Sequence, residues 1–377
     1  MTRSRVTLFV AAALCLPAVA RGQSSQFGIR GLGLPGRGLS TRATGMGGAN
    51  GLFDPRSARA VAPITQFDGL VTGFQTQQEW RNISNPAGTG NIRNNRFPLF
   101  RITGPVKRFR VWLVASANTY VNSDFGVVTS DSVSVRGSQV GVIDTLVSLG
   151  GLNDLRFGAG YELNRRWSVG AALHVITGST RNRIRRVFGD SAFRSFRDSS
   201  EISFDGIGLS VSVTGRLSRK LSVALLLRSD GNGNVTIDSA DVGQVDLPFT
   251  VAAGFEWRPS NRLTLATQGT FRSWSGINSD ILSRGGVGAV NTLAAEFGGE
   301  WLRGSLPIRF GVHWRELPFP LFPGVKPREI GVSLGTGLTF AQNRAAFDIS
   351  GEYVDRRQGP DWTETSWVLT AGVEVRP

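Results

Sequence analysis

The sequence predicts an all-β protein: a transmembrane antiparallel β-barrel of about fourteen strands, preceded by an N-terminal plug. Three observations lead to this fold class: an export signal, the lack of an apolar run long enough for a membrane-spanning helix, and aromatic-rich segments that alternate with a two-residue period. The chain also holds 48 glycines and 23 phenylalanines with only 19% charged residues, which is unusual for a water-soluble enzyme.

Residues 1–20 have the three parts of a secretory signal peptide. Met1 to Arg5 is basic, Val6 to Val19 is apolar, and Ala18-Val19-Ala20 has the small-x-small pattern of a cleavage site. The apolar part is shorter than the roughly 20 residues of a spanning helix, so we expect cleavage after about Ala20. The single cysteine, Cys15, lies in this segment, so the mature chain is expected to have no disulfide, thiolate metal site or cysteine nucleophile.

The strand period is clearest near the C-terminus. From Ile330 to Phe340 the even positions are mostly apolar, while the odd positions carry Gly, Ser or Thr. A soluble antiparallel sheet with one wet face would show the same alternation. The segments, however, run for about 10 to 13 residues, which matches a tilted membrane crossing and exceeds ordinary strands. The expected strands are 67–80, 97–104, 109–121, 152–163, 166–178, 204–217, 220–229, 247–259, 262–274, 291–303, 306–316, 329–340, 343–354 and 364–376.

The connections alternate in length, with tight turns followed by longer polar segments. Short periplasmic turns and long outer loops are typical of bacterial outer-membrane barrels, and an even strand count puts both termini in the periplasm. Residues 132–149 also have strand character, which would raise the count to about sixteen. The long polar loops are expected at 81–96, 122–151, 179–203, 230–246, 275–290, 317–328 and 355–363. Aromatic residues expected to form the interfacial girdles are Trp80, Tyr161, Trp167, Trp257, Trp274, Trp301 and Trp314.

Residues 21–66 differ from the rest because they are rich in glycine and show little alternation. Such a segment is either a disordered tail or a plug, and its apolar residues, such as Leu32, Met46 and Phe53, favour a packed plug. The expected organisation is therefore a signal peptide over 1–20, a plug or hatch over 21–66, and the barrel over 67–377.

The net charge of +14 comes almost entirely from arginine. The arginines are scattered rather than clustered, and an exported protein rarely meets nucleic acid, so we expect no nucleic-acid partner. Membrane lipids and lipopolysaccharide are the expected partners instead. The arginines between 181 and 197 would meet lipopolysaccharide phosphates if their loop is external; a simply solvated loop is the alternative.

The mature chain has two histidines, and neither lies beside a serine or aspartate in a catalytic motif. The sequence therefore predicts no enzyme, and it shows no metal-ligand cluster and no credible dinucleotide motif, so no cofactor is expected. By alternation, the polar side chains expected to face the lumen include His174, Arg258, Arg309 and His313.

Three stretches resemble the FadL-like family (OmpP1/FadL/TodX), the long-chain fatty-acid transporters of the outer membrane. They are Arg42-Ala43-Thr44-Gly45-Met46-Gly47-Gly48-Ala49, then 247–275 with its Leu247-Pro248-Phe249 start and Trp274-Ser275 end, and 306–340. The family's Asn-Pro-Ala after the hatch is replaced here by Val61-Ala62-Pro63, and the chain ends on Pro377 rather than an aromatic residue. The resemblance implies that ligand and hatch contacts fall on Arg42, Thr44, Gly45, Met46, Gly47, Gly48 and Ala49.

By this resemblance, the chain is expected to be a monomeric outer-membrane barrel, inserted by the assembly machinery, that takes up fatty acids or other hydrophobic small molecules. The ligand would leave sideways into the bilayer when the hatch rearranges. The alternative is a structural or secretion-associated barrel without transport, with its lumen filled by arginine and acidic pairs. An open porin is a third possibility, against which the plug argues.

Overall fold

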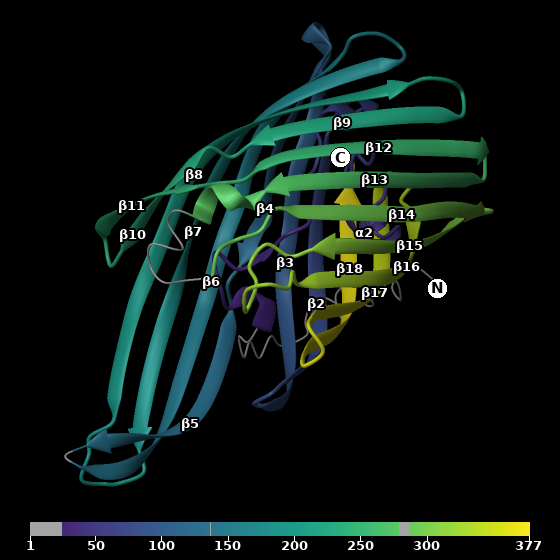
Figure 1. The fold of residues 1–377 in the computed structure, drawn as a ribbon. Coiled ribbons are helices and arrows are strands. Elements are labelled where there is room, and N and C mark those ends of the chain that lie inside the picture. Colours follow the sequence, from purple (N-terminus) through teal and green to yellow (C-terminus); the bar gives the residue numbers. More distant parts are fainter. Residues whose placement is uncertain (1–24, 136, 279–286) are drawn as a thin grey trace.

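The computed structural model describes residues 25–135, 137–278 and 287–377 and contains a closed antiparallel barrel of 14 strands around an interior segment (Figure 1). β18 pairs with β2 from Thr363↔Ser84 to Val375↔Thr72, which closes the ring. The predicted signal peptide lies outside the described residues. In barrel order the strands are β2 (Val71–Asn85), β3 (Gly88–Val106), β4 (Val111–Asn122), β6 (Ser138–Glu162), β7 (Trp167–Phe188), β8 (Phe196–Arg216), β9 (Leu221–Ser229), β12 (Phe249–Ser260), β13 (Leu263–Ser273), β14 (Thr292–Arg303), β15 (Leu306–Glu316), β16 (Arg328–Phe340), β17 (Ala345–Gln358) and β18 (Trp362–Val375).

The barrel has an inside-out pattern of polarity. On β16, Ile330, Val332 and Leu334 are 48 to 67% exposed, while Glu329 and Ser333 on the opposite face are buried. The alternation in the sequence therefore separates an apolar outer surface from a polar interior, as expected for strands surrounded by lipid. Within the described ranges, no helix has both the length and the apolarity needed to cross a membrane.

The two ends of the barrel differ. At the short-turn end, consecutive strands are joined by connections such as 163–166, 217–220 and 304–305. At the other end, here called the extended end, β6, β7 and β8 project well beyond the neighbouring strands, to the lower left of Figure 1.

Much of what the sequence predicts as long loops is strand. The hairpin of β2 and β3 turns at Pro86–Ala87, and β7 and β8 stay paired as far as Arg186↔Phe196. β5 (Phe125–Val135) pairs with β6, and the hairpin of β10 (Asn232–Ile237) and β11 (Ala240–Asp246) joins β8. The strand character of 132–149 thus lengthens a hairpin and adds no strand to the ring. Beyond the lipid both faces are polar, so the apolar alternation disappears while the backbone pairing continues.

The wall is split between β3 and β4 on the extended side. Their pairing runs only from Val106↔Val111 to Leu99↔Asn118. At that level β3 carries a bulge at Phe97–Pro98, and β4 carries one at Tyr120. A proline cannot donate to a neighbouring strand, so it suits the point where a ladder ends. Beyond this point the described part of β3 pairs only with β2.

The interior segment, residues 25–66, is here called the hatch. It contains η1 (Gln26–Gly28), β1 (Leu34–Pro35), α2 (Thr41–Gly45) and η2 (Ala62–Gln66). Ser40 caps α2 by accepting a hydrogen bond from the Ala43 amide at 2.9 Å. The helix contacts β15 to β18, and η2 contacts β4, β6, β7 and β8, so the hatch crosses the lumen from one wall to the other. β1 pairs with the free edge of β4 at Val121 and Asn122, beside the split.

One predicted girdle residue is not in a girdle. Trp257 and Trp301 are about half exposed on the outer surface, but Trp274 is only 1% exposed. The chain leaves β13 at Ser273 and forms the short helix η4 (Trp274–Ile277), which buries Trp274 with Tyr120 and Phe319. Trp274 has the same even parity as the inward-facing Ala266 and Gln268. Strand parity therefore predicts its buried position better than its place near a strand end does.

Candidate functional site

The hatch is joined to one half of the barrel wall by arginine–carboxylate pairs, four of which have distances of 2.9 Å or less. The carboxylates lie on β14, β17 and β18, and each is no more than about one-tenth exposed. Two of the pairs are bidentate, a geometry that fixes orientation as well as distance. The four pairs are Arg37–Glu352 at 2.7 Å, Arg42–Glu300 at 2.7 and 2.9 Å, Arg56–Glu374 at 2.9 Å and Arg59–Glu296 at 2.7 and 2.8 Å.

Within the hatch, Asp54 organises the turn after α2. Its carboxylate accepts hydrogen bonds from the Ser40 hydroxyl at 2.5 Å and from the Arg56 amide at 3.2 Å. Burial alone would raise the pKa of Asp54, but the charges of Arg42 and Arg56 and these hydrogen bonds lower it below its ordinary value. Asp54 is therefore held as an ionised group that ties two parts of the hatch together.

The residues of the Arg42–Ala49 motif lie directly on the inner wall. The Gly47 amide donates to the Ser333 hydroxyl at 2.8 Å, and Met46 and Ala49 are completely buried. A Cβ atom on Gly311 would lie 2.1 Å from the Met46 carbonyl carbon, so only glycine fits there. Thr44 bonds back to the Ser40 carbonyl at 2.9 Å, Gly45 faces Gly335, and Gly48 lies beside Glu296. The motif is thus a surface for close backbone contact, with Arg42 as its anchor.

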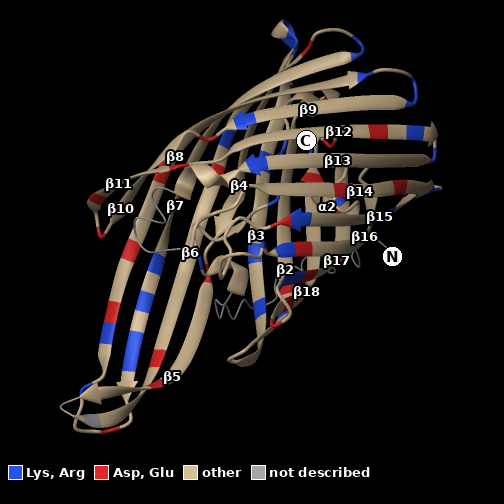
Figure 2. Cartoon of the chain, viewed as in Figure 1, with Lys and Arg blue, Asp and Glu red and all other residues tan. Residues whose placement is uncertain are grey.

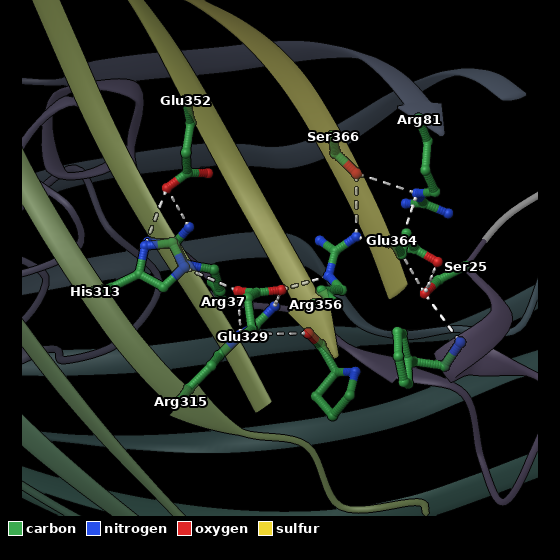
Figure 3. A network of polar contacts seen from close by, with 12 residues as sticks. Ser25, Arg37, Arg81, His313, Arg315, Glu329, Glu352, Arg356, Glu364 and Ser366 are labelled. Atoms are coloured by element: carbon green, nitrogen blue, oxygen red, sulfur yellow. Dashed lines mark hydrogen bonds and ion pairs between the residues drawn. The ribbon is translucent and has the colours of Figure 1, made fainter. Parts of the chain in front are cut away.

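A buried ionic network continues from the hatch across β15 to β18 and β2 (Figure 3). Its centre is Glu329, which contacts His313 Nε2 at 2.9 Å, Arg315 at 2.5 and 2.9 Å and Arg356 at 2.5 Å. The network reaches the hatch through Glu352, which lies 3.3 Å from His313 Nδ1 and 2.7 Å from Arg37. Its other end reaches the hatch through Ser25, which donates to Glu364 at 2.9 Å. Further members are Glu79, Arg81 and Arg96.

His174 has partners that the sequence did not reveal. Its Nδ1 lies 2.8 Å from Asp154 of β6, and its Nε2 lies 2.8 Å from the Ser210 hydroxyl of β8. The order of groups is that of a Ser-His-Asp triad, whose members are recognised by geometry rather than by sequence. Asp154 also pairs with Arg228 at 2.7 Å, and Ser210 is only 5% exposed.

The other two predicted lumen residues occupy different environments. Arg309 is buried and bridges Glu300 at 2.7 Å and Asp348 at 2.5 Å, close to the hatch. Arg258 is about half exposed and pairs with Glu256 at 2.7 Å. It lines a polar cavity of about 250 Å³ at the short-turn end. The four polar residues therefore do not form one site: His313 and Arg309 flank the hatch, while His174 and Arg258 lie apart.

Arg272 on β13 is a partly buried interior cation that Asp230 attracts from beyond ion-pair distance. In the described part of the chain, its guanidinium makes no hydrogen bond or ion pair. It lines two adjoining cavities of about 50 and 40 Å³ between the hatch and the wall. The other arginines that line them all have carboxylate partners: Arg37, Arg59, Arg228 and Arg315. Arg272 has the even parity of the inward-facing Ala266 and Gln268, but the sequence alone did not single it out.

An apolar cluster lies beside Arg272, next to the cavity that Arg272 and Trp274 both line. Trp274 lies at its centre, with ring centroids 5.3 Å from Phe319 and 6.5 Å from Tyr120. The cluster is formed by side chains of the barrel wall together with side chains of the segments that connect its strands. The remaining members are Leu32, Val121, Leu152, Ile176, Val235, Val245, Ile277 and Ala289. A cation with an apolar cluster on one side is suited to a ligand that has an anionic head and an apolar tail.

The described residues contain no group of three or more His, Cys, Asp or Glu side chains placed to hold a metal ion. The site is therefore defined by the hatch, its ionic ties, the unpaired Arg272 and the apolar cluster.

This fold and interior define a plugged outer-membrane β-barrel. Among solved structures, the chain is similar to a Pseudomonas aeruginosa FadL homologue (12% identity, TM-score 0.63, covering 91% of this chain and 99% of that one). It is also similar to the Pseudomonas putida toluene transporter TodX (11%, 0.59, 90% and 98%) and to the CymD monoaromatic hydrocarbon channel (15%, 0.57, 90% and 98%). No family profile and no curated protein matches the sequence. The chain thus has the fold of the FadL-like hydrophobic-compound channels, as its sequence resemblance implied.

Proposed function

We propose that this barrel takes up hydrophobic small molecules passively, and that its preferred ligands are long-chain carboxylic acids. The observation that carries this proposal is the unpaired Arg272 beside the apolar cluster around Trp274. A carboxylate would pair with this arginine directly through charge-assisted hydrogen bonds. The tail would gain about 0.8 kcal/mol for each CH₂ group that it buries.

The wall split supports a lateral exit into the membrane. By the usual rule for outer-membrane barrels, we infer that the short-turn end and both termini face the periplasm. Leu99, where the β3–β4 pairing ends, is seven residues from Val106 at the short-turn end, which is less than the roughly 9 to 11 residues of a crossing. The split therefore begins at membrane level. A cavity of about 90 Å³ is lined by Pro98 and Thr119 from its two sides, and by Leu34 to Leu39 of the hatch.

Gating is assigned to the hatch. β1 and the Gly36 amide, which donates to the Tyr120 carbonyl at 2.8 Å, occupy the free edge of β4 at the split. Release of this edge would join the lumen to the bilayer. Charged pairs hold the hatch elsewhere, and when such a pair opens into water the hydration that both charges regain offsets much of their lost attraction.

A double uptake assay tests the ligand class. In cells that express the barrel, Arg272→Gln should lower uptake of oleate about tenfold or more, because a charged hydrogen bond contributes roughly 1.5–3 kcal/mol. Uptake of toluene, which has no head group, should stay unchanged. Arg262→Gln, in a short turn, is the matched control. If Arg272→Gln lowers both substrates equally, or neither, the preference for carboxylic acids is wrong.

One observation favours a second candidate, a structural barrel without transport: the lumen at hatch level is packed with arginine–carboxylate pairs. This candidate requires that cells with and without the barrel take up oleate and toluene at the same rate. Faster uptake of either compound by the cells that carry the barrel rejects the structural candidate.

A further inference from the structure

The projecting part of β7 carries a run of arginines on one face. β7 pairs with β8 in unbroken register from Trp167 to Arg186. The alternation of inward and outward side chains in the barrel therefore continues along the whole strand. His174 is fully buried inside, while Leu173 is 42% exposed outside. Arg181, Arg183 and Arg185 have the parity of Leu173 and therefore share the outward, lipid-facing side. Figure 2 shows basic residues along the strands that project to the lower left.

A fourth arginine joins them across the sheet, since Arg197 of β8 is the register partner of Arg185. Arg181 is paired with Glu201 at 2.7 Å. Arg183, Arg185 and Arg197 have no hydrogen bond or ion pair with any residue that the structure describes. These three residues are here called the outer arginine strip.

The opposite face of the same sheet has the reverse charge. Arg186 lies there and pairs with Asp144 at 2.6 and 2.7 Å. By register, Asp131 and Asp198 share that inward face. On β7 and β8 the outward face thus carries four arginines against Glu201 and, nearer the barrel, Asp205, while β11 adds Asp241 and Asp246 on the same side. A merely solvated loop would have no reason to separate charge by face, because side-chain solvation does not depend on strand parity.

The outer arginine strip lies above the hydrocarbon, at the height of the polar saccharide part of an outer-leaflet glycolipid. A strand crosses the hydrocarbon in about 9 to 11 residues, so β7, counted from Trp167, leaves it near Thr177. With a rise of about 3.3 Å per residue and a tilt near 40°, Arg181 to Arg185 lie roughly 10 to 20 Å beyond that level. In the orientation proposed above, this is the outer leaflet, where phosphates and acidic sugars of glycolipids lie.

We propose that the outer arginine strip is a binding site for the phosphorylated headgroup of an outer-leaflet glycolipid of the lipopolysaccharide type. Arginine suits this role because its planar fork contacts phosphate in a bidentate manner. A lipid fits better than a free anion, because the strip continues the apolar surface of Leu173 and Ile207, on which acyl chains would pack. The site is separate from the hatch and does not depend on the transported ligand.

The test uses the full-length barrel in detergent, titrated with diphosphoryl lipid A and followed by native mass spectrometry. The strip variant combines Arg183→Gln, Arg185→Gln and Arg197→Gln. The control removes three exposed arginines from short turns at the other end: Arg165→Gln, Arg219→Gln and Arg262→Gln. We expect the strip variant to bind diphosphoryl lipid A at least tenfold more weakly than the native barrel, and the control to bind it unchanged.

Two further arms identify the ligand. Dephosphorylated lipid A should bind the native barrel as weakly as it binds the strip variant, and inorganic phosphate at equal concentration should not displace diphosphoryl lipid A. The single variant Arg185→Glu should weaken binding more than Arg185→Gln, which separates charge from loss of packing. Equal affinity of the strip and control variants would overturn the proposal. So would displacement by inorganic phosphate, because it would identify a free-anion site.

Discussion

Arg59 of the hatch and Glu296 of β14 form a two-point ion pair, with Nη1–Oε2 at 2.7 Å and Nη2–Oε1 at 2.8 Å. Both side chains are largely buried, at 12% and 4% exposure. Loss of one partner from such a pair leaves an uncompensated buried charge, at a cost of about 3–5 kcal/mol. The pair therefore controls how firmly the middle of the hatch is held against the wall.

We expect Glu296→Gln to loosen the hatch while the barrel stays folded. Hydrogen exchange should become faster at amides of residues 50–60, with no change in β14 to β18. Glu162→Gln, at an exposed carboxylate of the short-turn end, is the control. Equal hatch protection in the two variants would contradict the anchoring role of Glu296.

Gly311 should tolerate no side chain, because its Cβ would overlap the Met46 carbonyl carbon. Gly311→Ala should displace the Arg42–Ala49 motif. As in other overpacked sites, this should lower the free energy of unfolding of the hatch by a few kcal/mol. Gly351→Ala is a matched control on the outer face, since nothing lies within 4 Å of its added Cβ. Calorimetry of both variants measures the difference, and indistinguishable unfolding profiles would refute the close contact.

A disulfide can test whether the hatch must move. A Cβ on Gly372 of β18 would lie 3.2 Å from the Cβ of Thr41, close to the range of about 3.5–4.5 Å found in disulfides. The Thr41→Cys, Gly372→Cys variant should lose oleate uptake when oxidised and regain it with a reductant. Each single cysteine variant serves as control. Unchanged uptake in the oxidised double variant, with the cross-link verified by mass, would rule out gating by this part of the hatch.

The lowered pKa of Asp54 predicts an acid dependence of the hatch. Because the folded pKa lies below the ordinary value of 3.8, ionised Asp54 stabilises the packed hatch above that pH. The contribution is lost as the pH falls through the folded pKa. At pH 6, amides from Ser40 to Ser57 should therefore exchange more slowly in the native chain than in Asp54→Asn. This difference in exchange rate should shrink toward pH 3. A difference that does not vary with pH would contradict this assignment.

Ser210 should not react as a nucleophile, despite its hydrogen bond to His174. It is buried, and Asp154, the third member of the trio, is already neutralised by Arg228. A fluorophosphonate probe should leave the folded barrel unlabelled. Labelling that disappears in Ser210→Ala would show that Ser210 is accessible and would reopen the question of catalysis.

Local sequence patterns predicted most of the barrel. Alternation is a property of neighbouring residues, so Ile330 to Phe340 revealed a strand with one lipid face without knowledge of its partners. The same pattern predicted that His174 and Arg309 face inward, and that the glycine-rich segment before the barrel differs from it. The strand ends were less predictable, because β6, β7 and β8 continue past the membrane with both faces polar.

By itself, the sequence predicted the fold class, a ring of about 14 strands and a plug, because each follows from local periodicity and composition; the structure has 14 strands in the ring. Only the tertiary structure decided which charges are neutralised. His174 contacts Asp154 and Ser210, which lie on two other strands. Arg59 pairs with Glu296, whereas Arg272 has no ion pair within the described residues. Such partners depend on strand register and on the path of the hatch across the lumen, and both are set by contacts between residues far apart in the chain.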